Sequence, residues 1–276
     1  VLPVKDRQVI IKDSYEPVVF NLRLAPNREY RFVVFADFVK EGSSVTVNDK
    51  TMLEHQADLG LHHTIGADLR SITIKDDAIN EECTDAYFAF EDIEITNSAA
   101  KDIVLRRPYG KVRVIATDLA ELNLNIDPKA VKVTYTAKHP QTFNAVTGVV
   151  GKVEAVDYEF DYIYANISNK SLAEHYYTAG YDATKAENDN GELRHTHMTI
   201  FTDYILAEPT SEDAPVQTPY HFTMAVYDDA DMTSLIKETA FTTDIPVERN
   251  HLTTVIGNVL TTATEIEVRI DDNFAG

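Results

Sequence analysis

The sequence of 276 residues contains one cysteine, Cys83, and no tryptophan. One thiol cannot form an internal disulfide bond or complete a two-cysteine metal or redox pair. The residues around Cys83 are acidic and disfavour a thiolate, so we expect a buried structural side chain and not a nucleophile. Without tryptophan the chain lacks the usual flat platform for stacking sugars, although its 14 tyrosines leave a carbohydrate site open.

Long apolar runs and positive charge are also scarce. No stretch approaches the ~18 consecutive apolar residues that a membrane-spanning helix needs. The chain carries 25 Lys and Arg against 45 Asp and Glu, a formal net charge of −20. Because such a chain repels phosphate backbones and anionic lipids, nucleic acid is not expected as a partner. The start at Val1 has no initiator Met and no charged-then-apolar leader, so we expect a mature or trimmed form.

Short catalytic motifs are missing: there is no Gly-rich phosphate loop, no G-x-S-x-G turn and no H-E-x-x-H helix. Many enzymes lack short motifs, so this absence makes a catalytic residue or a cofactor less expected without excluding an enzyme. The strongest metal candidate is the pair His195 and His197, because residues i and i+2 of a strand share a face. A third ligand is not fixed by the sequence, so we expect no metal site, and a metal hydrolase or esterase is the weakest hypothesis. The other histidines considered are His62, His63, His175 and His221.

Two acidic loops, residues 187–192 and 228–231, are rich in oxygen ligands for calcium. Neither has the EF-hand spacing, and Asp and Asn also occur at turns simply to satisfy the backbone. Four basic residues cluster in one region, and in so acidic a chain we expect them to be ion-pair partners or strand-face residues. They are Arg106, Arg107, Lys111 and Arg113.

Most of the predicted elements are strands. Residues 18–24 alternate, which predicts a strand with its even-numbered apolar side chains inward. Residues 30–39 are apolar on both faces, as in a central strand, except that Asp37 needs hydrogen-bond partners or a strand-end position. Residues 103–117 predict a strand interrupted at Pro108. Further strands are expected at residues 9–11, 86–90, 93–95, 131–135, 158–164, 195–206, 220–227 and 235–241.

The chain is longer than one comfortable core, and its regular strands and turns favour β-sandwiches over alternating βαβ units. We expect an all-β fold with a few short helices and two domains, residues 1–121 and 122–276, and one large sandwich is the alternative. Near that boundary, Asp118 is predicted to cap a short helical turn, with Glu121 three residues on.

The last two predicted strands are residues 249–260 and 265–274. From residue 265 the apolar and charged side chains alternate strictly, which indicates a half-buried strand. The apolar face therefore needs a partner, which is either this subunit's own sheet or an open groove in a neighbouring copy. The residues of that face, our candidate assembly strand, are Ile266, Val268, Ile270 and Phe274.

Four segments in order carry a resemblance to a known family. They are residues 30–39, 85–88, 105–114 and 249–261. In this order and spacing they resemble the fimbrillin-like surface proteins of Bacteroidetes, the subunit superfamily of type V pili. The resemblance spans nearly the whole chain.

The resemblance implies two tandem transthyretin-like β-sandwich domains, no catalytic activity, and export as a lipoprotein precursor to the outer membrane. It also implies a role in fimbria assembly or cell adhesion, in which a terminal strand of one subunit fills a groove of the next. The partners would be other fimbrial subunits. A second hypothesis is a monomeric surface module that binds carbohydrate or host ligands, suggested by the tyrosines of residues 158–164 and the long loops of residues 41–85.

Overall fold

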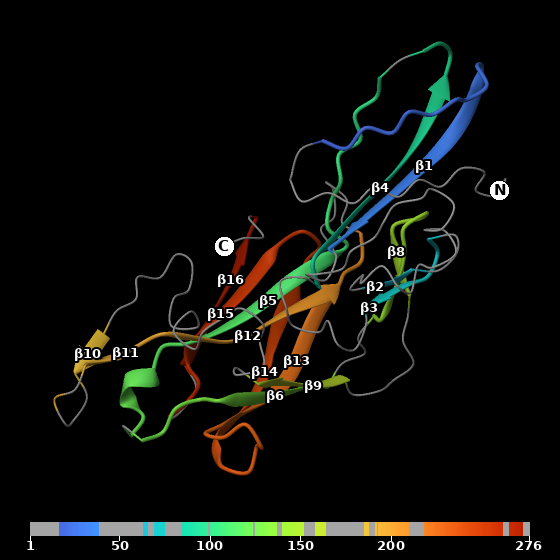
Figure 1. Cartoon of the computed structure of the whole chain (residues 1–276). Helices are drawn as coiled ribbons and strands as arrows, with labels where there is room; N and C mark the ends of the chain where they lie inside the picture. The colour runs from blue at the N-terminus through green and yellow to red at the C-terminus, as the bar shows by residue number, and fades with distance from the viewer. Residues whose placement is uncertain are drawn as a thin grey trace.

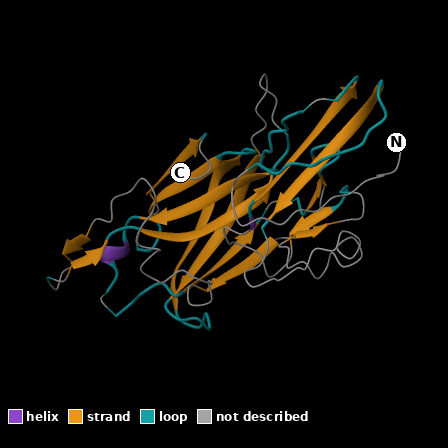
Figure 2. Cartoon of the chain, turned by 45° about the horizontal axis from the view of Figure 1, so that its top comes forward, coloured by secondary structure: helices purple, strands orange, loops and turns teal. Residues whose placement is uncertain are grey.

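The computed structural model describes residues 17–38, 63–65, 69–74, 84–98, 100–123, 125–136, 140–151, 158–163, 185–187, 191, 193–209, 218–261 and 265–272. The expected all-β fold is confirmed, since strands make up most of these residues (Figure 2). No helix in this part of the chain is long and apolar enough to cross a membrane. The strands are β1 (Arg28–Asp37), β2 (His63–Ile65), β3 (Ile72–Ile74), β4 (Ala86–Ile95), β5 (Tyr109–Ala116), β6 (Ala130–Tyr135), β7 (Thr142–Asn144), β8 (Val149–Gly151), β9 (Tyr158–Ile163), β10 (Lys185–Glu187), β11 (Leu193–His195), β12 (Met198–Leu206), β13 (Thr218–Tyr227), β14 (Leu235–Val247), β15 (Leu252–Asn258) and β16 (Glu265–Asp271), with one 3-10 helix, η4 (Leu119–Glu121).

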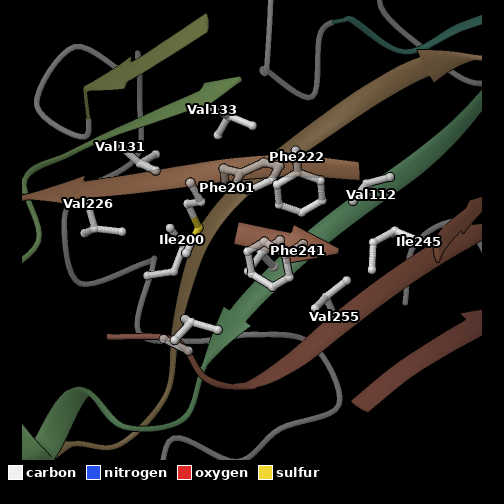
Figure 3. Packing of buried hydrophobic residues seen from close by; sticks show 14 of the residues in the cluster. Val112, Val131, Val133, Ile200, Phe201, Phe222, Val226, Phe241, Ile245 and Val255 are labelled. Carbon is white, nitrogen blue, oxygen red and sulfur yellow. The ribbon is translucent and has the colours of Figure 1, made fainter. Parts of the chain in front are cut away.

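Two four-stranded sheets form a β-sandwich. One sheet has the order β12-β5-β15-β16 and the other the order β14-β13-β6-β9 (Figure 1). All their pairings are antiparallel except that of β5 with β15, which is parallel. Alternate side chains of both sheets meet in one apolar core (Figure 3). Its members include Val112, Val131, Val133, Phe201, Phe222, Phe241 and Val255.

A second, smaller core lies beside the sandwich. It is built by the sheet β2-β3-β7-β8 and by the two-stranded ribbon of β1 and β4, which extends away from the rest of the chain (Figure 1). The rings of Phe88 and Phe143 meet edge to face here, 4.6 Å apart. Tyr109 of β5 and Tyr204 of β12 also belong to this core. Because β5 and β12 supply side chains to both cores, these two strands join the sandwich to the smaller core.

The sandwich includes strands from both sides of residue 121. Strand β5 precedes this residue, whereas its neighbours β12 and β15 follow it. The division of the chain into domains 1–121 and 122–276 stays a prediction.

Two predicted strands differ in the structure. Residues 18–24 form no strand, and their apolar side chains are largely exposed, reaching 71% for Val19. The sequence of this segment alternates, but the chain turns at Asn27 (φ 55°), just after it. The segment is held to the ribbon by a hydrogen bond from Ala25 N to Tyr30 Oη at 3.0 Å. Residues 30–39 were expected to form a central strand. Instead β1 pairs with β4 in a ribbon and most of its residues are half-buried.

Other predictions agree with the structure. Strand β5 begins directly after Pro108, which is where the interruption was expected, but residues 103–107 form no strand and only Arg106 pairs, with Phe88, in an isolated bridge. Asp37 lies at the end of β1 and is hydrogen-bonded, as a carboxylate in an apolar run requires. The predicted strands at residues 9–11 and part of the loop region 41–85 lie outside the described residues, as does Cys83.

Candidate functional site

The candidate site is the closing pair, which we define as β15 and β16. The two strands are antiparallel, with Val255 opposite Val268 and seven paired positions in total. Strand β15 lies inside the sheet, between β5 and β16. Strand β16 ends the sheet order in the described part of the chain, so the closing pair puts the terminal strand at a rim of the sandwich (Figure 1).

The alternation of β16 positions its apolar side chains as the sequence predicts. Ile266 and Val268 are partly buried and pack against the sandwich core. Ile270 shares their parity but lies near the strand end and is 37% exposed. Phe274 lies outside the described residues. The strand is thus seated in its own subunit, and the assembly role of these residues stays a proposal.

The opposite face of β16 is charged and exposed. Arg269 Nε donates to Glu267 Oε1 at 2.7 Å, and Arg269 Nη2 donates to Glu267 Oε2 at 2.9 Å. This bidentate contact lowers the pKa of the Glu267 carboxyl. Because both side chains are exposed, the pair contributes little to stability.

A tight turn holds the start of β15. Asn250 takes a left-handed conformation (φ 65°), and its backbone N–H donates to Tyr109 O at 2.7 Å. Strand β5 approaches this turn closely at Gly110, where a Cβ atom would lie 2.6 Å from Glu248 O. A larger residue at this position would therefore push the turn away from β5.

Arg249 anchors the same turn to the smaller core. Its guanidinium donates through Nε to Ala207 O at 2.9 Å and through Nη2 to the same oxygen. It also lies over the rings of Phe88 and Phe143, 5.5 and 5.6 Å from their centroids. Burial lowers the pKa of Arg249 to about 10, so the side chain remains charged at neutral pH. The start of the closing pair is thus fixed to both cores.

Asp118 anchors the other end of β15. Its carboxylate accepts hydrogen bonds from the backbone N–H groups of Val259, Leu260 and Thr261 at 3.2, 2.9 and 2.8 Å. Thr261 Oγ1 donates to the same carboxylate at 2.8 Å. The predicted helical turn is present as η4, but Asp118 makes no side-chain capping hydrogen bond to it. That capping prediction is wrong, because the carboxylate instead satisfies the backbone that leads from β15 toward β16.

A buried polar cluster links the ribbon to the sandwich. His63 Nδ1 lies 2.8 Å from Asp37 Oδ1, and His63 Nε2 lies 2.5 Å from Tyr109 Oη. Burial is the main cause that raises the pKa of Tyr109, followed by the charges of Asp37 and Asp85, so its hydroxyl stays protonated. In the neutral imidazole, Nδ1–H then donates to the carboxylate and Nε2 accepts from the tyrosine. The side chains of Asp37 and His63 are almost fully buried, so this cluster joins β1, β2 and β5 inside the structure.

A second buried carboxylate lies within the sandwich. Asp203 Oδ2 accepts from Tyr135 Oη at 2.9 Å, across the two sheets, and Asp203 Oδ1 accepts from Tyr204 N at 2.8 Å. Burial raises the pKa of Asp203 to about 6. Nothing in the sequence pattern indicated this contact, because its two partners are 68 residues apart.

The metal candidates do not converge. His195 ends β11, whereas His197 lies between β11 and β12 with its Nδ1 2.7 Å from Thr196 Oγ1. Burial lowers the pKa of His197. The described part of the chain has no group of three or more His, Cys, Asp or Glu residues that could hold a metal ion. His62 and His175 lie outside that part.

The acidic loop at residues 228–231 and Arg107 of the basic cluster have structural partners. Asp229 accepts hydrogen bonds from the backbone N–H groups of Thr233 and Ser234, and these lower the pKa of its carboxyl. Arg107 Nε donates to Asp85 Oδ2 at 2.7 Å, as expected for an internal ion pair. Burial, the largest cause, nevertheless raises the pKa of Asp85.

Three solved structures from Bacteroides species are similar to this chain. A putative cell adhesion protein from Bacteroides ovatus has 14% identity and a TM-score of 0.40, over 92% of this chain and 71% of that one. A putative adhesin from Bacteroides thetaiotaomicron has 9% identity and a TM-score of 0.44, over 92% and 78%. A putative cell adhesion protein from Bacteroides uniformis has 10% identity and a TM-score of 0.41, over 91% and 93%.

Comparison with curated proteins gives no match. A family model, in contrast, matches residues 3–276, which is nearly the whole chain. The chain therefore belongs to the family of unknown function DUF6562.

Proposed function

We propose that the chain is a bacterial surface protein of the fimbrial type, either a fimbrial subunit or a fimbria-associated adhesin. It is exported as a lipoprotein precursor and acts at the outer membrane, in cell adhesion and without catalysis. Its partners are other fimbrial subunits, joined through the closing strand β16. The four segments that resemble fimbrillin-like proteins support this proposal.

The observation that carries the proposal is the position of β16 at the rim of the sandwich. Among the described residues β16 pairs with one strand only, β15, and a strand at a sheet end can be replaced without breaking the interior of the sheet. Its alternating apolar side chains provide the affinity, because moving an aliphatic side chain from water into a core contributes about 1.5–3 kcal/mol. Its backbone groups provide the hydrogen bonds that guide an added strand. An equivalent strand from a neighbouring subunit can therefore occupy the same place.

Peptide addition to a shortened chain tests this proposal. A chain that ends at Thr261 lacks β16, and a synthetic peptide of residues 262–276 should bind it and restore its melting temperature. A peptide with Val268→Asp should fail, because it places a charge toward the core. The matched peptide with Glu267→Lys should bind, because residue 267 lies on the exposed face.

Assembly is then measured with the whole protein. Purified subunits should form open-ended multimers in which β16 of one chain crosslinks to β15 of another. If multimers never form, or form equally well without residues 262–276, the strand-exchange proposal is wrong. Saturable binding on a glycan array by a strictly monomeric protein would favour the carbohydrate-binding module instead.

A further inference from the structure

Among the residues that the structure describes, no strand pairs with the outer edge of β16, the edge that faces away from β15, and the strand is regular. All seven of its residues pair with β15 without a register shift, so the strand contains no bulge in that pairing. It also contains no proline. Bulges and prolines are two of the common devices that keep sheet edges from pairing with other chains. Charge is another such device, and β16 carries charged side chains, so their arrangement bears on what the edge can accept.

The charges of β16 are self-complementary about Val268. In an antiparallel pair of identical strands with a twofold axis at this residue, Glu267 of each copy faces Arg269 of the other. Both contacts are attractive, and opposite charges directly across two strands stabilise the pairing. On the other face, Val268 meets its own copy and Ile266 meets Ile270. This register pairs the full length of the strand, from Glu265 to Asp271.

Neighbouring registers are worse. Moving the axis to residue 267 places two glutamates opposite each other, and moving it to residue 269 does the same with two arginines. An axis at Ile270 pairs Arg269 with Asp271, but it puts Val268 against Asp272. In the favoured register the like charges of Glu265 and Asp271 meet only at the ends of the strand, where water and salt screen them.

The side chains are already placed for this pairing. Glu267 and Arg269 are 59% and 49% exposed, and both extend from the same face of the strand. In the single subunit they bind each other along the strand, at 2.7 Å. Ile270 is 37% exposed and would be covered by the second copy's Ile266. The pairing therefore covers exposed apolar surface without moving the strand out of its own subunit.

The geometry points to the outer edge of β16 as a symmetric interface with a second copy of this chain. Each copy keeps its own β16 in this interface. The β12-β5-β15-β16 sheet of one copy and the same sheet of the second copy then form one continuous eight-stranded sheet. This goes beyond the proposed strand exchange, because no strand is donated and the assembly closes at two copies. It can therefore hold whether or not strand exchange occurs.

Charge reversal tests the interface with the whole chain, by sedimentation velocity over a range of protein concentrations. Where strand exchange does not occur, the unmodified chain is expected to form a dimer. Glu267→Arg and Arg269→Glu, made separately, should each weaken dimerisation at least tenfold, because each places two like-charged pairs across the axis. An equimolar mixture of the two variants should dimerise again, since both cross-strand contacts between residues 267 and 269 are then attractive. The double variant should also dimerise.

Controls separate this interface from other effects. Glu238→Arg on the exposed face of β14 changes the net charge by the same amount and should leave the dimer intact. Should a reversed variant fail to fold, Glu267→Gln and Arg269→Gln give the same comparison with smaller perturbation. A chain that is monomeric at every concentration, or single variants that dimerise like the unmodified chain, would overturn the inference. Open-ended multimers that need Val268 but ignore both charges would also overturn it, and would leave strand exchange standing.

Discussion

The carboxylate of Asp118 accepts a hydrogen bond from the backbone N–H of Thr261 at 2.8 Å, although the two residues are 143 positions apart. Asp118 is 1% exposed, so this contact is shielded from water. The segment it holds leads from β15 toward the terminal strand. The position of β16 at the rim therefore depends on a residue that precedes η4, far from the C-terminus.

Replacing Asp118 with Ala should lower the free energy of unfolding by about 2–4 kcal/mol. The variant removes an acceptor of four hydrogen bonds and leaves buried N–H groups unsatisfied. Chemical denaturation measures the loss, and hydrogen exchange should show faster exchange at Leu260 and in β16. Glu121→Gln is the matched control, because its single 3.2 Å contact with Thr261 is exposed and should matter by less than about 0.5 kcal/mol. Equal loss in both variants would contradict the anchoring role of Asp118.

The seating of β16 gives a second prediction. Val268→Asp should destabilise the single subunit by about 1–3 kcal/mol, because Val268 packs against the sandwich core. Glu267→Lys should change the melting temperature of the single subunit very little, since its partner Arg269 is an exposed neighbour. Thermal unfolding at low protein concentration compares them. A subunit that melts normally with Val268→Asp would show that β16 does not stabilise its own chain.

Local pattern predicted most of the strands, because alternation and turn residues act within a few positions. It placed β5 after Pro108 and gave β16 the correct inward face. It failed for residues 18–24, where alternation exists but no sheet partner follows. A strand forms only where another strand pairs with it, and that partner can lie far away in the sequence.

Polar contacts between residues far apart in the chain could not be predicted from the sequence for the same reason. Asp118 looks like a helix cap from its neighbours, and only the folded chain brings Thr261 to it. Asp37 was expected to need a partner, yet no nearby residue identified His63. In a sandwich, the strands that become neighbours determine these contacts. The sequence around a buried polar side chain can therefore show that it needs a hydrogen-bond partner, but it does not identify that partner.

Asp203 makes stability depend on pH. Its pKa is about 6 in the folded state, because of burial, against the ordinary value of 3.8. The folded state therefore holds the proton more tightly than the unfolded state between these values. This stabilisation is complete below about pH 4 and is lost as the pH rises through about 6. The difference corresponds to a contribution on the order of 3 kcal/mol.

Asp203→Asn isolates that contribution. The amide cannot ionise, so the unmodified chain should lose on the order of 3 kcal/mol relative to the variant between pH 4 and pH 7. Urea unfolding at several pH values measures the difference, and other titrating groups cancel between the two proteins. Asp231→Asn, in the exposed loop before β14, removes the same charge and is the control. If the difference in unfolding free energy between Asp203→Asn and the unmodified chain does not change with pH, the pKa of the Asp203 carboxyl is not raised.

The hydroxyl of Tyr109 links the ribbon and β2 to the sandwich through His63. Tyr109→Phe keeps the ring in the smaller core but removes the group that satisfies His63 Nε2. Because this nitrogen is buried, we expect the free energy of unfolding to fall by about 1–3 kcal/mol. The control is Tyr227→Phe, on a half-exposed ring at the end of β13, where a loss below about 0.5 kcal/mol is expected. Hydrogen exchange should place the added opening at β1 and β2, with β13 and β15 unchanged. If both variants behave alike, or if exchange rises across the whole sandwich, the contact between His63 and Tyr109 does not hold the ribbon to the sandwich.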